Sequence, residues 1–314
     1  MNYVGLQSQI WRNNTNSVLL LVMFPLVLYA LTWVFLYFVW GGENYEPVVN
    51  ANQGFVALFP WITVGVAIWF LVAWASHSSM IRRATGSRPL ERKENKRVYN
   101  LVENLSITAG MKMPKVNIIE DDSLNAFASG LSERTYTVSL SRGIIEKLND
   151  QELEGVIAHE LTHIRNRDVR LLIISIIFVG IFAFLAEMFF RTMLYGGSSS
   201  RKGKNGGAVL IGLALALVGY FLSMLFRFAI SRKREYMADA GGAQLTKNPL
   251  ALASALERIS GDPRIEAVKR KDVAQMFIEN PQEKEKKKNA GFSFSSLFAT
   301  HPPIEERIRL LKQF

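Results

Sequence analysis

Four apolar runs constrain the fold of this 314-residue chain more than any other feature. They extend over residues 17–40, 55–75, 171–190 and 208–226. Each run is close to the ~20 apolar residues that a helix needs to cross the hydrocarbon core of a bilayer. The hydrophobic content of 49% does not by itself decide the class of protein. The placement of the apolar residues in these runs predicts a multi-pass membrane protein with four transmembrane helices.

The charges beside these runs predict the orientation of the chain. Residues 76–98 hold seven Arg or Lys against two Glu, and basic clusters beside a span stay in the cytoplasm. The loop of residues 41–54 contains Glu43 and Glu46 but no Lys or Arg, which places it outside. The turn of residues 191–207 is basic and breaks this pattern, so spans three and four either cross fully or dip into the membrane without crossing.

The net charge of +10 does not by itself indicate a nucleic acid partner. The basic residues lie beside the apolar runs, and no basic patch interleaved with aromatic residues accompanies them. They favour contact with lipid headgroups and a role in membrane topology, so the predicted partner is the lipid bilayer and not a nucleic acid. The chain has no cysteine, which excludes disulfide bonds and thiolate metal ligands.

The strongest chemical pattern follows Asn149. Asn149 and Glu152 form a capping box, and apolar residues recur after them at helical spacing, so a buried helix is predicted. His159 and His163 are four residues apart, about 400° around this helix, so both imidazoles face one way and can reach one metal ion. Glu160 lies between them, too close to be a third ligand but well placed to take a proton from metal-bound water.

A zinc ion in a hydrolase takes three protein ligands and a water molecule, so two histidines leave one protein ligand to be found. Glu235 is the predicted third ligand, because it is the first acidic residue after the fourth apolar run. Asp239 follows one helical turn later and can accept the second ring hydrogen of a zinc histidine. The alternative is that Glu235 pairs with Arg232 or Lys233 at the membrane surface. The predicted ligands of one zinc ion per chain are therefore His159, His163 and Glu235.

A small β-sheet is predicted between the second apolar run and the zinc helix. Residues 115–120 and 135–140 alternate or run apolar and are rich in β-branched side chains. Residues 125–130 lie between them, and we expect an exposed edge strand there that pairs with an extended substrate peptide beside the zinc helix. The alternative is an interior strand or a loop. The predicted fold class is α+β and mainly helical, with a small sheet and four transmembrane helices.

The order of these features predicts four segments. They are an N-terminal membrane hairpin (1–75), a first soluble segment with the zinc helix 149–168 (76–168), a second membrane hairpin (169–226), and a second soluble segment with the third zinc ligand (227–314). Ligands of one zinc ion must lie within a few ångströms of each other. The second hairpin must therefore leave the zinc helix and return to it.

These motifs together resemble those of the HtpX-type membrane metalloproteases, which are relatives of the CAAX prenyl endopeptidases. The resemblance covers nearly the whole chain and rests on Asn125-Ala126-Phe127-Ala128, His159-Glu160-Leu161-Thr162-His163, Glu235 with Asp239, and Thr300-His301-Pro302. It implies a zincin-like metallopeptidase domain in which His159, His163 and Glu235 bind zinc and Glu160 is catalytic. Four spans fit the HtpX type better than the prenyl endopeptidases, which have more.

The resemblance also implies a function and a location. It implies a zinc-dependent endopeptidase of the bacterial inner membrane, with one peptidase domain facing the cytoplasm and a role in the quality control of damaged or misfolded membrane proteins. In the implied reaction, Glu160 activates the zinc-bound water and no covalent intermediate forms. His301 either stabilises the oxyanion, approaches the zinc in an inactive state, or is only a helix-entry residue.

Two other functions remain as alternatives. Four spans and the intramembrane acid Glu187 suggest a transporter or channel, but this reading does not explain the metal motif. A scaffold that holds zinc for structure alone would need no base, and the intact Glu160 argues against it.

Overall fold

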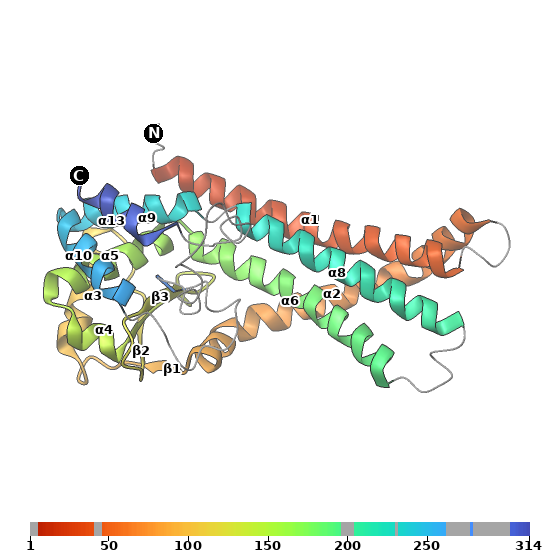
Figure 1. Cartoon of the computed structure of the whole chain (residues 1–314), viewed down its shortest axis with the longest axis horizontal. Coiled ribbons are helices and arrows are strands. Elements are labelled where there is room, and N and C mark those ends of the chain that lie inside the picture. The colour runs from red at the N-terminus through yellow and green to blue at the C-terminus, as the bar shows by residue number, and fades with distance from the viewer. Residues whose placement is uncertain (1–5, 41–45, 196–203, 230–231, 262–276, 279–301) are drawn as a thin grey trace, which may run out of the picture. The chain divides into compact units, whose positions relative to one another are not determined.

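A computed structural model describes residues 6–40, 46–195, 204–229, 232–261, 277–278 and 302–314 (Figure 1). The chain divides into two compact units. The membrane unit contains residues 15–75 and 174–227, and the sheet unit contains residues 1–14, 76–173 and 228–314.

Four long helices contribute to the membrane unit. They are α1 (Leu6–Trp40), α2 (Pro47–Thr85), α6 (Asp168–Tyr195) and α8 (Lys204–Ala229). Each contains a stretch that is long and apolar enough to cross a membrane. The stretches are Ile10–Val39, Pro47–Thr85, Asp168–Tyr195 and Gly207–Met224. They overlap the four predicted runs, so the prediction of four helices of spanning length is confirmed.

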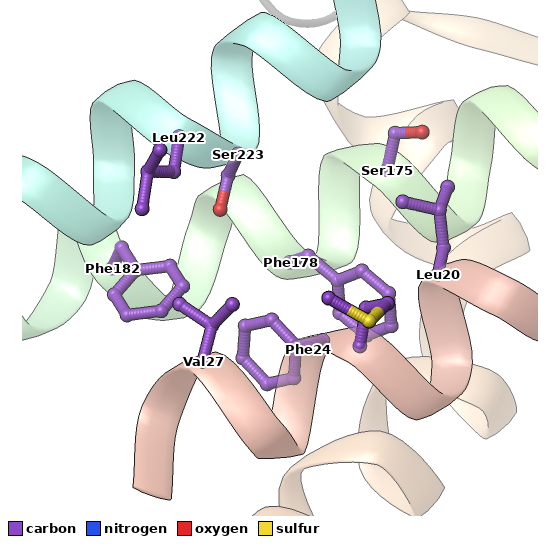
Figure 2. A pocket seen from close by; sticks show the side chains of 9 residues that line it. Leu20, Phe24, Val27, Ser175, Phe178, Phe182, Leu222 and Ser223 are labelled. Atoms are coloured by element: carbon purple, nitrogen blue, oxygen red, sulfur yellow. The ribbon is translucent and has the colours of Figure 1, made fainter. Parts of the chain in front are cut away.

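Aromatic side chains pack inside the membrane unit and line a small cavity (Figure 2). Phe24 of α1 stacks on Phe178 of α6 with ring centroids 4.2 Å apart, and Phe182 meets Phe24 edge-on at 5.3 Å. The hydroxyl of Ser223 also lines the cavity, but it donates to the carbonyl of Gly219 in its own helix at 2.9 Å. None of the lining side chains is titratable.

The sheet unit contains a mixed four-stranded sheet with the order β1-β2-β4-β3. The strands are β1 (Ser87–Pro89), β2 (Lys115–Ile119), β3 (Ala126–Ser129) and β4 (Thr137–Ser141). β2 and β4 are parallel, whereas β1 and β3 run antiparallel to their neighbours. Three strands overlap the stretches predicted from the sequence. β3 is last in the order of the sheet, but all four of its residues are buried, so the prediction that this edge is exposed is wrong.

Helix α5 (Asp150–Arg165) is the central helix of the sheet unit. It packs against β3 and against α3 (Lys96–Thr108), α9 (Arg232–Thr246) and α10 (Pro249–Gly261). Among the described residues, the other helices are α4 (Arg142–Lys147) and α13 (Ile304–Leu311), the second of which packs on α9 and α10. All residues from Val156 to Thr162 are buried, so the helix lies inside this unit rather than on its surface. The α+β, mainly helical fold class is confirmed.

The ends of α5 have clear local causes. The predicted capping box is confirmed, because the Asn149 side chain accepts from the Glu152 amide and the Glu152 side chain accepts from the Asn149 amide. The helix ends at Arg165, earlier than the predicted boundary at residue 168. Arg167 adopts the left-handed conformation with φ of 61°, which ends the regular helix, and α6 then begins at Asp168.

Two glycines allow α9 to lie directly against α5. A Cβ atom on Gly241 would lie 2.4 Å from Cγ2 of Thr162, and one on Gly242 would lie 3.1 Å from the backbone nitrogen of His159. Only a residue without a side chain permits such an approach of two helices. The acidic residues of α9 are thereby brought to the histidines of α5.

Candidate metal centre

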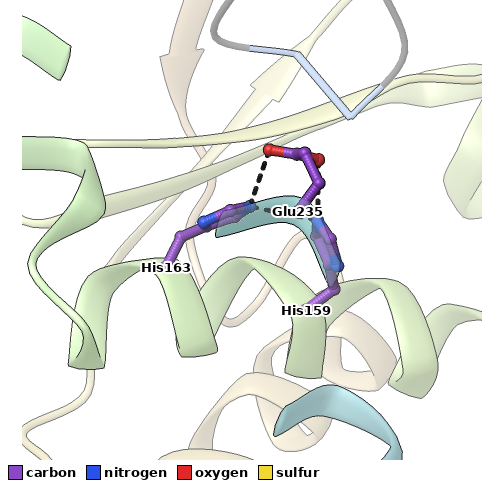
Figure 3. A group of neighbouring side chains, drawn as sticks. All are labelled: His159, His163 and Glu235. Atoms are coloured by element: carbon purple, nitrogen blue, oxygen red, sulfur yellow. Dashed lines mark hydrogen bonds and ion pairs between the residues drawn. The ribbon is translucent and has the colours of Figure 1, made fainter. Parts of the chain in front are cut away.

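His159 and His163 lie one turn apart on α5, and Glu235 of α9 faces both of them (Figure 3). The two Nε2 atoms are 3.1 Å apart. Oε1 of Glu235 lies 3.5 Å from Nε2 of His163, and Oε2 lies 3.8 Å from Nε2 of His159. Each of the three residues thus offers a donor atom within 4.8 Å of the others.

A carboxylate contacts the far side of each imidazole. Nδ1 of His159 lies 3.0 Å from Oδ1 of Asp239, and Nδ1 of His163 lies 3.0 Å from Oδ2 of Asp168. When a ring is neutral, a carboxylate at Nδ1 favours the hydrogen there and leaves the lone pair on Nε2, the nitrogen that faces Glu235. The contact of Asp239 is the one that the sequence led us to expect, whereas Asp168 was not predicted.

This donor set fits a tetrahedral zinc ion. Ligand atoms at 2.0–2.1 Å from such an ion lie about 3.3 Å from one another. The two Nε2 atoms are 3.1 Å apart, and the nearer Glu235 oxygen to each lies at 3.5 or 3.8 Å. Histidine nitrogen and carboxylate oxygen are both zinc ligands, and three of them leave the open position of a hydrolytic site. Burial would lower the pKa of His163, but the carboxylates of Glu235 and Asp168 outweigh it and raise that pKa to about 9. The pKa of the neighbouring His159 is instead lowered, first by its complete burial.

Glu160 directly follows His159 in α5 and precedes His163. Its side chain is buried, and the residue is 2% exposed. It accepts a hydrogen bond from the backbone of Ala128 in β3, which places it beside the edge strand. Burial, with a contribution from the Glu235 carboxylate and against the attraction of His163, raises the pKa of Glu160 to about 7. A carboxyl group with such a pKa can take up and release a proton near neutrality.

The chain is similar to known proteins over most of its length. The profile of peptidase family M48 matches residues 92–314, which include the two histidines, both glutamates and the supporting carboxylates. The chain belongs to peptidase family M48. The "Protease HtpX homolog" of Bacteroides fragilis is 59% identical over 100% of both chains. The "Protease HtpX homolog" of Thermoanaerobacter pseudethanolicus is 36% identical, and the match covers 96% of this chain and 95% of that protein.

These relatives confirm the resemblance to the HtpX-type proteases. The crystal structure of S. mikatae Ste24p also aligns with this M48 chain, with a TM-score of 0.49 and 18% identity over 96% of this chain and 66% of that chain. With four helices of spanning length, the protein is an HtpX-type membrane protease.

Arg307 was not predicted as part of the site of this M48 protease. Its side chain is fully buried, and its guanidinium donates to both carboxylate oxygens of Asp239 at 2.8 and 2.7 Å. Burial favours the neutral form of Asp239, but the attraction of Arg307 outweighs it and holds the pKa of Asp239 at about 2. In the sequence, Arg307 lies three residues after Ile304 and four before Leu311, so helical spacing places it on the apolar face that α13 buries, and this spacing is the signal that could have found it.

Some predictions fall outside the described residues of this M48 protease. They concern His301 and most of the basic turn between spans three and four. The alternative partners of Glu235, Arg232 and Lys233, have side chains that are likewise not described.

Proposed function

We propose that this M48 protease is a zinc-dependent endopeptidase with His159, His163 and Glu235 as metal ligands and Glu160 as catalytic base. The observation that carries the proposal is the carboxylate behind each histidine, with both Nε2 atoms turned toward Glu235. A buried imidazole in a core also needs a partner for its N–H, but a core would not need two further ring nitrogens turned toward one shared carboxylate. In a metal site, the carboxylate behind each ring fixes the tautomer and the ring orientation.

The residues divide the chemical work among them. Zinc, when bound, supplies Lewis acidity that polarises the scissile carbonyl and makes water more acidic. Glu160 accepts the proton of the attacking water and passes it to the leaving amine. Its contact with Ala128 supports a substrate position along β3, because an extended peptide beside that strand would carry its scissile bond past Glu160.

We further propose that segments 76–168 and 227–314 form one peptidase domain and that segments 1–75 and 169–226 form two membrane hairpins. The grouping of residues 76–173 and 228–314 in one compact unit supports this division. The basic residues within 76–98 support a cytoplasmic location of the domain in a bacterial inner membrane. The substrates we propose are protein chains, in particular damaged or misfolded membrane proteins.

The proposed base is tested with Glu160→Gln in the full chain purified in detergent. The amide preserves the shape of the side chain and removes its basicity, so zinc content should be unchanged while peptidase activity falls about 10²- to 10⁴-fold. Activity is measured on a membrane-protein substrate with mass spectrometry of the products. Equal activity in the two proteins would refute the role of Glu160.

The proposed ligands are tested by zinc content under titration with a chelator. Glu235→Gln, His159→Ala and His163→Ala should each release zinc at lower chelator concentration than the wild-type protein, because each removes a ligand. Lys312→Gln, on the exposed end of the C-terminal segment, is the control. If the Glu235→Gln curve coincides with the wild-type curve, a different third ligand is required, and His301 is the first to examine.

A further inference from the structure

Arg307 of α13 contacts both α9 and residues 277–278 in the sheet unit. Besides Asp239, its guanidinium contacts Glu235, whose Oε2 lies 3.5 Å from Nη1. Nη1 also donates to the backbone carbonyl of Ile278 at 3.1 Å. The side chain is 0% exposed, so none of these contacts is shared with bulk solvent. The C-terminal helix thus reaches the metal centre through one residue.

The Ile278 contact matters because of where that residue lies. Phe277 forms an antiparallel bridge with Phe127 of β3, and the Ile278 amide donates to the carbonyl of Ala126 at 2.9 Å. The rings of Phe127 and Phe277 pack edge-on with centroids 4.7 Å apart, and Phe277 is fully buried. Residues 277–278 therefore cover part of the edge of β3, next to the Ala128 backbone that contacts Glu160.

We propose that Arg307 is a positioning residue that couples this covered edge of β3 to the metal centre. One planar guanidinium holds the Asp239 carboxylate, which orients His159, and also holds the carbonyl of Ile278. An extended substrate on β3 would require residues 277–278 to move. Arg307 transmits this movement to Asp239. The inference rests on the proposed function, because it assumes that zinc binds at His159.

The chemistry of the contacts explains why this residue is arginine. A guanidinium presents five N–H donors in a rigid fork, so it can bind a carboxylate with two bonds and still donate to a third acceptor. An ammonium group is a compact charge on a flexible stem and cannot hold the same three acceptors in one plane. The positive charge of the Arg307 guanidinium also balances the buried negative charge of Asp239. Arg307→Lys therefore keeps the charge and removes the geometry.

The test compares Arg307→Lys with Arg309→Lys in the full chain in detergent. Arg309 is a matched control, because it lies on the same helix, is exposed, and pairs with Glu306 of that helix. Two quantities are measured, namely zinc affinity by chelator competition and hydrogen exchange of the Ile278 amide by mass spectrometry. Arg307→Lys should weaken zinc binding about 10- to 100-fold and speed the exchange of Ile278, whereas Arg309→Lys should change neither.

A double variant tests whether Arg307 acts through Asp239. Asp239→Asn should weaken zinc binding by a similar factor, and Arg307→Lys should cost less in that background than in the wild type, because two residues on one path are not additive. The cost that remains comes from the direct contacts of Arg307 with Glu235 and with Nε2 of His159. Fully additive losses would overturn the proposal. So would Arg307→Lys with wild-type zinc affinity and wild-type exchange.

Phe277→Ala keeps the proposal testable if Arg307→Lys does not fold. It removes the ring contact that holds the cover on β3 while leaving every metal ligand in place. Zinc affinity should change about twofold or more, and an unchanged affinity together with faster Ile278 exchange would refute the coupling. Both readouts are independent of peptidase activity. If the wild-type protein takes up no zinc, the proposed function is refuted. The role of Arg307 would then be decided by the hydrogen exchange of Ile278 in Arg307→Lys and Arg309→Lys.

Discussion

We expect the proposed zinc binding to be sensitive to a single methyl group at the contact between α9 and α5. In Gly241→Ala, the new Cβ would lie 2.4 Å from Cγ2 of Thr162. Thr162 cannot turn away, because it is 2% exposed and its hydroxyl donates to the carbonyl of Ala158 at 2.8 Å. Two carbon atoms require about 3.5 Å or more, so the helices must separate locally by roughly 1 Å.

The expected loss follows from how little displacement a metal site accepts. Ligand distances in a working site vary by only about 0.2 Å, which is well below this separation. Overpacking of a well-packed contact costs about 1–3 kcal/mol, and the helices can relieve it by moving Glu235 away from the histidines. Since every 1.4 kcal/mol is tenfold in an equilibrium constant, we expect zinc affinity to fall about 10- to 100-fold.

Chelator competition on the purified protein measures this loss. Gly261→Ala is the control, because a Cβ at Gly261 meets no atom within 4 Å. Adding Thr162→Ser to Gly241→Ala removes the clashing methyl group, keeps the hydroxyl, and should restore most of the affinity. Wild-type affinity in Gly241→Ala would refute the reasoning, and a double variant as weak as the single one would show that the clash with Thr162 is not the cause.

Three further predictions concern the rest of the chain. Asp168→Asn should weaken zinc binding about 10- to 100-fold in chelator competition, because it removes the carboxylate behind His163; an unchanged affinity would contradict that role. Asn149→Ala should cost about 1 kcal/mol of stability by removing the cap of α5, seen as a lower melting temperature, and a melting temperature equal to that of wild type would count against it. Because the chain has no cysteine, cysteines introduced at Ser78 and Asn50 can be labelled individually in intact cells. A membrane-impermeant thiol reagent should reach only the one at Asn50, and the reverse pattern would invert the proposed orientation.

Several features could be predicted from the sequence because they depend on neighbours in the chain. The capping box at Asn149 and the i, i+4 spacing of His159 and His163 are local, so the helix and the shared face of its histidines follow directly. The four spanning helices follow from where the apolar residues lie along the chain, since a bilayer requires about 20 apolar residues in a row.

Other features were decided only by the tertiary structure. Asp168 reaches His163 because the left-handed conformation of Arg167 ends α5, and α6 begins just beyond it. The sequence does not show that this single residue adopts that conformation. Arg307 lies 148 residues from His159 along the chain and reaches the site only through the packing of α13 on α9 and α10.

Glu235 shows where the two kinds of information meet. Its place as the first acid after the fourth apolar run made it the candidate ligand, and that argument used sequence order alone. Its distance to the histidines depends on how closely α9 approaches α5, which Gly241 and Gly242 set by having no side chains. Sequence order therefore determined which residue could serve, and helix packing decided that its carboxylate lies within reach, because a metal site requires positions accurate to a few tenths of an ångström.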